Sequence, residues 1–329
     1  MSSHFAGKAV LVTGGGGFIG SHVVDRLARD GAEVRAFLHY NSRGDVGALG
    51  WDSDLSEIDL RFGDLRDEGA LAAAAEGCHT ILHLGALIAI PYSYVAPRDV
   101  VETNVLGTLN VLSAARRAGI ERLVCLSTSE VYGTPEGEAI TERDRLNAQS
   151  PYAASKIAAD QLALSFHRSF GTPVGVLRPF NTYGPRQSAR AVIPTILAQG
   201  LTGGALALGS LHPVRDFLFV EDTVAALLAF AGWRDAPGSL LHVGTGHGVT
   251  VEEVVRLAGD ILGRNLDVRL DEQRVRPDAS EVQRLVCDAS QARGRLGWEP
   301  VVSLRKGLER TAGWIERNLR RYRPDVYAV

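Results

Sequence analysis

The first half of the chain alternates short apolar, β-branched runs with segments in which apolar residues recur at helical spacing. This alternation predicts strands and helices in turn, which is typical of an α/β fold whose doubly wound parallel sheet carries helices on both faces. The expected strands are residues 8–13, 33–38, 58–62, 80–84, 122–127, 174–177 and 240–243. The expected helices are residues 19–29, 68–76, 98–118 and 151–170, and a strand–helix unit is expected over 216–231.

The pattern changes after residue 179, where the chain becomes irregular and rich in glycine and proline. From residue 250 onward helices alternate with short segments. These changes predict a first domain over residues 1–180, rejoined by about 216–245, and a smaller C-terminal domain made of residues 181–215 and 246–329.

A glycine-rich loop with the sequence TGGGGFIG follows the first expected strand and opens the first expected helix. Gly14 permits a tight turn, Gly17 lets the backbone approach a pyrophosphate, and Gly20 lets the helix and the strand pack closely. Phe18 and Ile19 belong to the same expected phosphate site. A plain turn is the alternative, but the strand–loop–helix context predicts a dinucleotide-binding domain of the Rossmann type over residues 1–180.

The end of the second expected strand, FLHYNSR, bears on the choice of dinucleotide. A carboxylate that binds the adenosine ribose and repels a 2′-phosphate usually stands there, and this chain has none before Asp45. Arg43, which follows Asn41 and Ser42, can pair with a 2′-phosphate or can equally be a solvated loop residue. The sequence therefore leaves both NAD and NADP open.

Composition limits the partners and the compartment. Hydrophobic residues make up 45% and charged residues 22% of the 329 residues, the formal net charge is −3, and the pI is about 6.3. This balance gives no polybasic attraction to nucleic acid or to a membrane. The most apolar stretch, residues 81–90, is much shorter than a membrane span, and residues 1–7 are too short and polar for a signal peptide. The three cysteines lack metal-ligand spacing, so we expect no metal site, a buried free thiol at Cys125 and a cytoplasmic location.

Two segments carry candidate catalytic groups. Tyr152 and Lys156 stand four residues apart on one face of the helix expected over 151–170. The lysine ammonium favours the phenolate form of the tyrosine, which can then take a proton from a substrate hydroxyl while hydride leaves the same carbon. The fifth expected strand ends in Thr128, Ser129 and Glu130, at the carboxyl edge where open α/β sheets bind ligands. Together the segments predict an oxidoreductive active site.

The order of these motifs resembles that of the extended short-chain dehydrogenases/reductases, within their NAD-dependent epimerase/dehydratase family. The resemblance covers essentially the whole chain and is carried by Thr-Gly-x-x-Gly-x-x-Gly, Gly63-Asp64-Leu65, His83-Leu84-Gly85-Ala86, Asn104, Ser-Thr-Ser-Glu, Tyr-x-x-x-Lys and Arg178-Pro179-Phe180-Asn181. The chain looks most like nucleotide-sugar 4,6-dehydratases. Residues 87–97 and 181–190 resemble the UDP-N-acetylglucosamine 4,6-dehydratase of the legionaminic-acid type.

This resemblance implies roles for matching positions. Asp64 and Leu65 would flank the adenine, Lys156 the nicotinamide ribose, and Thr128 and Tyr152 the 4-hydroxyl of the sugar. Further cofactor contacts are implied for Leu84, Gly85, Ala86 and Asn104. The substrate, a nucleotide sugar, would be held in the C-terminal domain by Asn181, Arg186, Arg190, Arg215 and Arg276, although each of these arginines can instead be a surface residue. The resemblance also implies a homodimer and a tightly bound NAD that each cycle regenerates.

The implied reaction begins with oxidation at C4 by Tyr152 and the cofactor. Glu130 then removes the proton at C5, water leaves from C6, and hydride returns to C6. Many such dehydratases have Asp as general acid where this chain has Ser129, whereas GDP-mannose dehydratases resemble it in having Thr-Ser-Glu. The acid therefore stays open, with Glu130 in both roles as one option. The alternative functions are a UDP-sugar or UDP-hexuronate 4-epimerase, a UDP-glucuronate decarboxylase and, more remotely, a non-catalytic NAD(P)-sensing module.

Overall fold

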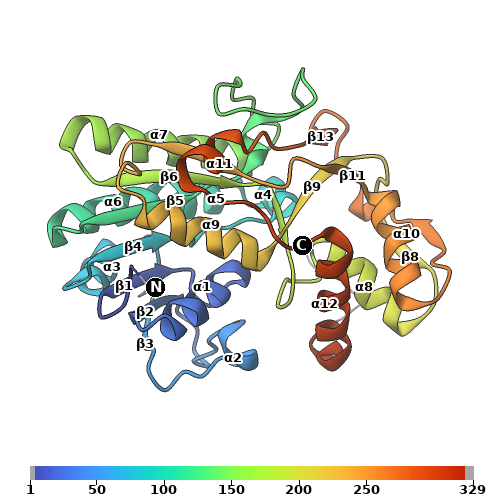
Figure 1. Ribbon diagram of the computed structural model, residues 1–329, viewed down its shortest axis with the longest axis horizontal. Coiled ribbons are helices and arrows are strands. Elements are labelled where there is room, and N and C mark those ends of the chain that lie inside the picture. The colour runs from blue at the N-terminus through green and yellow to red at the C-terminus, as the bar shows by residue number, and fades with distance from the viewer. Residues whose placement is uncertain (1–3, 323–329) are drawn as a thin grey trace. The chain divides into compact units, whose positions relative to one another are not determined.

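A seven-stranded sheet dominates the first of two units into which the chain divides in the computed structural model, which describes residues 4–322 (Figure 1). The first unit contains the residues up to 128, together with 150–178 and 224–241. The second contains residues 129–149, 179–223 and those from 242 onward.

The strands of the large sheet lie in the order β10-β6-β5-β4-β1-β2-β3. Their bounds are β1 (Ala9–Thr13), β2 (Glu33–His39), β3 (Asp59–Gly63), β4 (Thr80–His83), β5 (Arg122–Leu126), β6 (Val174–Pro179) and β10 (Leu240–Val243). The pairs from β3 to β6 are parallel. The strand order reverses between β1 and β4, and a reversal of this kind marks the crevice in which doubly wound folds bind ligands.

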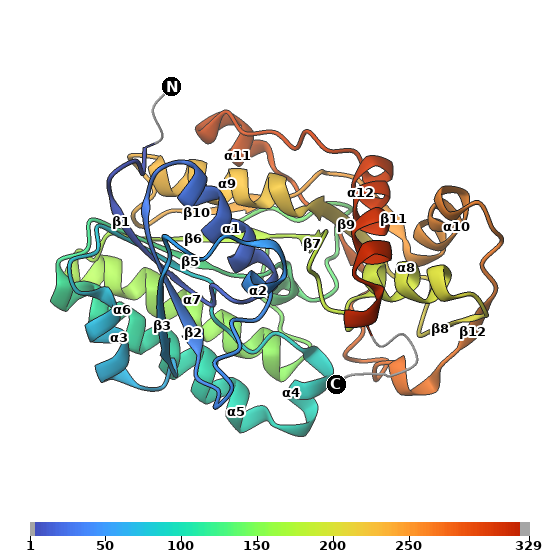
Figure 2. The same ribbon diagram turned by 90° about the horizontal axis from the view of Figure 1, so that it is seen from below.

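Helices cover both faces of this sheet (Figure 2). Their bounds are α1 (Phe18–Arg29), α2 (Leu49–Asp52), α3 (Glu68–Ala75), α4 (Ile90–Val95), α5 (Pro97–Val101), α6 (Gly107–Ala118), α7 (Pro151–Phe170) and α9 (Val220–Gly232). Figure 2 shows α3, α6 and α7 along one face, with α1 and α9 along the other. Val10, Leu11 and Val12 of the central strand are at most 1% exposed, as expected for a strand with helices on both faces. The predicted α/β fold class is confirmed.

The helix expected over residues 98–118 differs from the prediction. A π-helical turn, η1 (Glu102–Leu106), separates α5 from α6. It contains Asn104, whose side chain bonds to the backbone of Leu87 and to Ser155. Because single π turns frequently occur where a helix places a functional side chain, we attribute the interruption to these long-range bonds of Asn104.

Helix α7 has well-defined ends. The side chain of Ser150 accepts a hydrogen bond from Ala153 N at 3.1 Å, and Pro151 occupies the first turn. Gly171 ends the helix with φ +68°, a left-handed conformation that favours glycine. These local signals explain why the sequence predicted the bounds of this helix correctly.

The second unit combines small sheets with helices. Its elements are η2 (Ser129–Tyr132), β7 (Asn181–Tyr183), α8 (Val192–Thr202), β8 (Leu206–Leu208), β9 (Val214–Phe219), β11 (Gly248–Thr250), α10 (Val251–Leu262), β12 (Val268–Leu270), η3 (Glu272–Arg274), β13 (Arg284–Leu285), α11 (Ser290–Leu296), α12 (Leu304–Arg317) and η4 (Leu319–Arg321). Strand β9 pairs with β7, β11 and β13, and helix α8 packs against α10 and α12. The division differs from the expected domains, because residues 129–149 cluster with this unit and the first unit is rejoined by residues 224–241.

Candidate active site

The glycine loop between β1 and α1 has the geometry of a phosphate cradle. Gly14 has φ +70°, and a Cβ there would lie 2.8 Å from Gly85 Cα, in the loop after β4. A Cβ at Gly20 would lie 2.1 Å from Gly14 O, so close packing of α1 also requires glycine. Gly17 is exposed at the N-cap of α1, and no side chain caps the helix there. The first N–H groups of α1, beginning at Phe18, are therefore available to an anion.

A buried chain of hydrogen bonds links the loops after β1 and β4. Gly85 N donates to Thr13 Oγ1 at 3.2 Å, and Thr13 Oγ1 lies 2.7 Å from His83 Nδ1. On the other side of the ring, His83 Nε2 lies 3.0 Å from Thr108 Oγ1, which donates to Asn104 O at 2.6 Å. Thr108 has thus used its proton, so His83 carries its own proton on Nε2 and accepts from Thr13 at Nδ1.

His83 stays neutral in this chain. Burial, and after it the charge of Lys156, lowers its pKa to about 3. The sequence predicts no role for His83 beyond its place in a motif. Its bonds show that it fixes the loop of Leu84, Gly85 and Ala86, for which cofactor contacts were expected.

Asn104, another expected cofactor residue, is 1% exposed and bonds to protein groups. Its Nδ2 donates to Leu87 O and Ser155 Oγ, both at 2.9 Å, and its Oδ1 accepts from Leu87 N at 2.8 Å. Asn104 therefore joins the segment after β4 to α7, the helix that carries Tyr152. Direct contact with a dinucleotide stays a prediction.

Two further expected cofactor segments lie at the ends of β2 and β3. The side chain of Asn41 organises its own loop, accepting from Asp45 N at 2.8 Å and donating to Asp45 O at 2.8 Å. Ser42 and Arg43 are exposed in that loop. The guanidinium of Arg66 bonds to both carboxylate oxygens of Asp64 and lowers its pKa, so Asp64 is ionised and has a partner on its own loop.

Leu65 lies against the glycines of neighbouring segments. A Cβ at Gly107 would lie 2.8 Å from Leu65 Cβ, and one at Gly85 would lie 3.0 Å from Leu65 Cδ1. Asn110 Nδ2 donates to Leu65 O at 2.9 Å. Leu65 is thus held between α6 and the loop after β4, and its contact with the adenine stays a prediction.

The candidate catalytic pair lies on α7. Tyr152 is 7% and Lys156 6% exposed, and Tyr152 packs against Ile90 and Val100. Lys156 Nζ donates to Leu126 O at 2.8 Å, at the end of β5. Burial lowers the pKa of Lys156, which makes this ammonium a stronger acid than an exposed lysine. Thr128, two residues beyond Leu126, is half-buried in the same unit.

Ser129 and Glu130 begin the second unit in the short helix η2. Ser129 is 2% exposed, whereas Glu130 is half-buried. Tyr132, at the end of this helix, lies with its hydroxyl 2.7 Å from Nε2 of the buried His242. The ring of His242 also contacts Ile140 O through Nδ1 at 3.3 Å, so the tyrosine hydroxyl donates and η2 is anchored by this bond.

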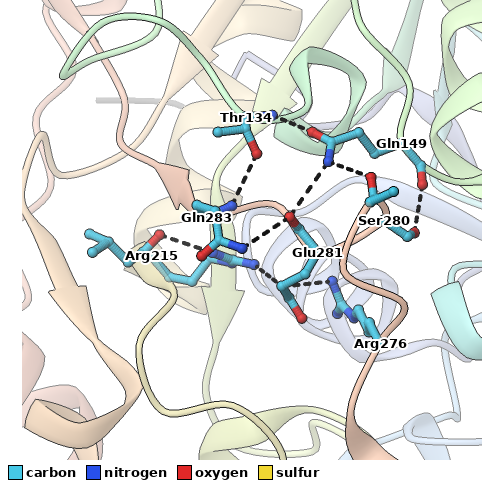
Figure 3. Close-up of polar contacts among 9 residues, drawn as sticks. Thr134, Gln149, Arg215, Arg276, Ser280, Glu281 and Gln283 are labelled. Atoms are coloured by element: carbon cyan, nitrogen blue, oxygen red, sulfur yellow. Dashed lines mark hydrogen bonds and ion pairs between the residues drawn. The ribbon is translucent and has the colours of Figure 1, made fainter.

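An arginine cluster of the second unit surrounds Glu281 (Figure 3). Arg215 Nη2 donates to Glu281 Oε1 at 2.9 Å, and Arg276 Nη1 lies 3.6 Å from the same oxygen. Burial lowers the pKa of Arg215, while the charges of Glu130 and then Glu281 raise it. Glu130 and the arginine cluster are therefore electrostatically coupled. Arg276 Nη1 is buried and has no hydrogen-bond partner among residues 4–322, which suits an anionic ligand.

The loop that carries this cluster is clamped by Gln149 (Figure 3). Gln149 Nε2 donates to Ala279 O at 2.9 Å, and Gln149 O accepts from Ser280 Oγ at 2.5 Å. Its Oε1 accepts from Thr134 N at 2.5 Å, and Thr134 Oγ1 accepts from Gln283 N at 3.1 Å. Thr134 and Gln149 both belong to the segment 129–149, which also contains Glu130. This segment therefore fixes residues 279–283.

The remaining expected substrate residues differ in their surroundings. Asn181 pairs in register with Phe217 on β9, and its Oδ1 is buried without a hydrogen-bond partner in the described part of the chain. Arg186 is 8% exposed and is the one non-glycine residue between 4 and 322 with a positive φ, +69°. Strain of this kind persists only where surrounding structure enforces it. Arg190 is exposed, which makes it the least supported member of the expected set.

Other features constrain the chemistry less. The expected buried free thiol at Cys125 is confirmed, and burial raises its pKa to about 12, so it stays protonated. No group of three or more His, Cys, Asp or Glu side chains within residues 4–322 is placed to hold a metal ion. Across those same residues, every helix is too short or too polar to cross a membrane.

Comparison with known proteins agrees with this arrangement. The profile of the family described as GDP-mannose 4,6 dehydratase matches residues 11–311. The dTDP-glucose 4,6-dehydratase of Streptomyces antibioticus is 33% identical over 319 residues, which cover 94% of this chain and 92% of that protein.

Two solved structures share the fold over nearly the whole chain. The epimerase Mth375 of Methanothermobacter thermautotrophicus has a TM-score of 0.89 at 30% identity, covering 96% of this chain and 95% of the other. The dTDP-glucose 4,6-dehydratase DesIV of Streptomyces venezuelae, solved with NAD bound, has a TM-score of 0.86 at 32% identity, with coverages of 96% and 99%.

Proposed function

This chain belongs to the GDP-mannose 4,6 dehydratase family, and from that premise we propose that it is an NAD-dependent nucleotide-sugar 4,6-dehydratase acting on a UDP-linked hexose or N-acetylhexosamine. The observation that carries the proposal is the carboxylate of Glu130. It stands two residues after Thr128 and interacts electrostatically with Arg215. A dehydratase needs such a base in addition to the tyrosine–lysine pair, whereas C4 oxidation alone does not.

NAD fits the glycine loop by its shape. The uncapped start of α1 and the Cβ-free surface of Gly14 and Gly17 would hold the pyrophosphate. The loop from Asn41 to Arg43 has no carboxylate, so it leaves the choice between NAD and NADP open. The relatives support NAD, because DesIV was solved with NAD. When bound, NAD supplies the site that takes a hydride from C4 of the sugar and later gives it to C6.

The chain's own groups would move the protons. Tyr152 takes the proton of the 4-hydroxyl, assisted by the ammonium of Lys156, and Thr128 hydrogen-bonds the same oxygen. The resulting 4-ketone acidifies the C5 proton, which Glu130 removes. Loss of water from C6 then requires a proton on the leaving oxygen. Glu130, having just been protonated, can return it, and the hydroxyl of Ser129 is the alternative donor.

The arginine cluster would bind the diphosphate of the substrate. Guanidinium groups match phosphate oxygens with paired N–H donors. Arg276 has a buried N–H nitrogen without a hydrogen-bond partner among the described residues, which is a place for a phosphate oxygen. Arg215 and Arg186 lie in the same unit and supply further charge. The buried Oδ1 of Asn181 offers an acceptor to a ligand hydroxyl or N–H.

A homodimer formed through α5, α6 and α7 is part of the proposal. Val101, Leu106 and Phe170 are 46%, 47% and 53% exposed on this part of the first unit. Exposed apolar side chains of this size are available to a partner chain. Light scattering coupled to size-exclusion chromatography would give the mass of two chains, and a single-chain mass would contradict this point.

A UDP-sugar 4-epimerase is the second candidate, because the epimerase Mth375 shares the fold at a TM-score of 0.89. The deciding experiment is mass spectrometry of products from a panel of UDP-, dTDP- and GDP-sugars. A dehydratase product has lost one water, an epimerase product has an unchanged mass, and a decarboxylase product has lost CO₂. An unchanged mass with an inverted C4 would replace the proposed dehydratase by the epimerase.

A further inference from the structure

A buried ion pair joins helix α7 to strand β6. The proposed reaction assigns no role to it. The side chains of Asp160 and Arg178 are each 2% exposed. Asp160 Oδ2 accepts from Arg178 Nε at 3.0 Å and from Arg178 Nη2 at 2.8 Å. The same oxygen accepts from Ser127 Oγ at 2.7 Å. Because an ion pair loses hydration when it is buried, it needs hydrogen bonds of this kind to offset that cost.

This pair continues the catalytic face of the helix. Tyr152, Lys156 and Asp160 follow one another at intervals of four residues, so they lie along one side of α7. Lys156 bonds to Leu126 O, and Asp160 bonds to the side chain of the next residue, Ser127. One face of the helix thus holds two consecutive residues at the end of β5.

Arg178 attaches the helix to the neighbouring strand. It lies on β6, which pairs with β5 in a register that places Leu177 opposite Leu126. Asp160 therefore bonds to side chains from two adjacent strands at their carboxyl ends. Rotation or sliding of α7 would break these bonds inside the core, so the ion pair fixes the position of the face that carries Tyr152.

The pair also acts on Lys156 through its charge. Burial is the largest influence and lowers the pKa of Lys156, whereas the carboxylate of Asp160 is the neighbouring group that raises it most. Arg178 lowers it by less than Asp160 raises it. His83 faces the same ammonium from β4 and is neutral. Among the neighbouring groups, Asp160 gives the strongest support to the charged form of Lys156.

We propose that Asp160 is a positioning residue, which fixes α7 to the ends of β5 and β6 through Ser127 and Arg178 and places a carboxylate one helical turn from Lys156. The consequence for catalysis rests on the proposed function, because only there does the ammonium assist Tyr152 as a base. The consequence for Lys156 itself is independent of any reaction.

The lysine content of the chain permits a direct test. Lys8, Lys156 and Lys306 are its three lysines. Protein labelled with carbon-13 at the lysine ε position gives three NMR signals, and the shift of each signal with pH reports loss of one ammonium proton. Lys306 is exposed and serves as the internal reference. In the wild type we expect Lys156 to titrate below the ordinary lysine range, because burial lowers its pKa, with and without added NAD.

Substitutions in the ion pair should move Lys156 in opposite directions. Asp160→Asn removes the supporting carboxylate and leaves Arg178 charged, so the Lys156 signal should titrate at a lower pH than in the wild type. Arg178→Met removes a repelling charge and should move it to a higher pH. The double variant Asp160→Asn/Arg178→Met should fall between Asp160→Asn and the wild type, because Asp160 has the larger effect of the two. Ser127→Ala changes no charge and should leave the titration in place.

The double variant keeps the test valid if the single variants do not fold. It replaces a buried ion pair by neutral groups of similar volume, and such replacements usually preserve folding. A Lys156 titration in the folded double variant that stays at, or rises above, the wild-type position would overturn the proposal. A lower position supports it.

A second measurement concerns catalysis. If the ammonium form of Lys156 is needed, the high-pH limb of the kcat profile should shift to lower pH in the double variant, in step with the NMR titration. A lowered kcat whose pH profile stays in place would show a purely structural role for Asp160. The two proposals can fail separately. If the NMR titration shifts as expected but the protein dehydrates no nucleotide sugar, the role of Asp160 is supported and only the proposed function is rejected.

Discussion

Replacing Arg276 by methionine is the perturbation that most directly tests the diphosphate site. The Arg276 side chain is 27% exposed, and its Nη1 lies 3.6 Å from Glu281 Oε1, beyond hydrogen-bond length. Glu281 keeps its bond to Arg215 at 2.9 Å when Arg276 is removed. The fold should therefore lose no more than about 1 kcal/mol, as is usual for a partly exposed ion pair.

The cost to binding should be larger than the cost to stability. If a phosphate oxygen accepts from the buried Nη1, the charge-assisted bond contributes about 1.5–3 kcal/mol. At about 1.4 kcal/mol for each factor of ten, this is a loss of about 10- to 100-fold in affinity. The methionine retains the apolar part of the side chain, so the loss reflects the guanidinium group.

Isothermal titration calorimetry with UDP and with dTDP measures this loss without any reaction. Both nucleotides carry the diphosphate and lack the sugar, so the result is independent of which sugar the enzyme uses. Arg274→Met is the matched control, because Arg274 lies two residues away and its Nε already bonds to Asp271 at 2.9 Å. Equal affinity of Arg276→Met and wild type, or an equal loss in Arg274→Met, would refute this placement of the diphosphate.

Four further predictions concern individual residues. Tyr152→Phe should lower kcat by about 10²–10⁴-fold while calorimetry shows retained nucleotide-sugar binding, and normal turnover would contradict a proton-transfer role. In deuterated solvent the wild-type product should carry deuterium at C5, whereas Glu130→Gln should form no such product; a 4-epimerase would leave C5 unlabelled in both. Gly17→Val should abolish tight dinucleotide binding in calorimetry, because its Cβ would already lie 3.1 Å from Gly14 O and the methyl groups would enter the phosphate path. Burial lowers the pKa of His83 from 6.5 to about 3, so the native state binds fewer protons than the unfolded state and stability should fall as pH drops from 6.5 toward 3, by about 3–5 kcal/mol. Urea unfolding should show a flatter acid slope for His83→Gln, and an unchanged slope would assign the acid sensitivity to other groups.

The sequence was most informative where structure depends on local patterns. The expected strand over 240–243 and the helix over 151–170 have the same bounds in the structure. For the helix, Ser150, Pro151 and Gly171 are end signals that lie within a few residues of the termini they define. The glycine loop could be predicted equally well, because contacts inside one strand–loop–helix unit and with the loop after β4 require glycine at positions 14 and 20.

Long-range contacts explain where the prediction failed. The π turn in the helix expected over 98–118 depends on bonds from Asn104 to Leu87 and Ser155, which no spacing within the helix reveals. Likewise, Arg190 and Arg276 are equivalent in sequence, as arginines in polar, irregular segments. Only the fold shows that Arg190 is exposed, whereas Arg276 has a buried nitrogen beside Glu281.

The candidate catalytic groups themselves were visible in the sequence, but the groups that set their charge were not. Lys156 is one turn from Asp160. On most helices two charged side chains at this spacing lie in solvent, and their interaction contributes little to stability. Here both are buried, and the influence of Asp160 depends on Arg178, which follows 18 residues later. His83 is similar, since its neutral form follows from burial and from the charge of Lys156, which lies on a different element of the fold. A motif therefore identifies the reacting side chains of such a site, while their protonation at working pH follows from burial and from partners that only the folded chain brings together.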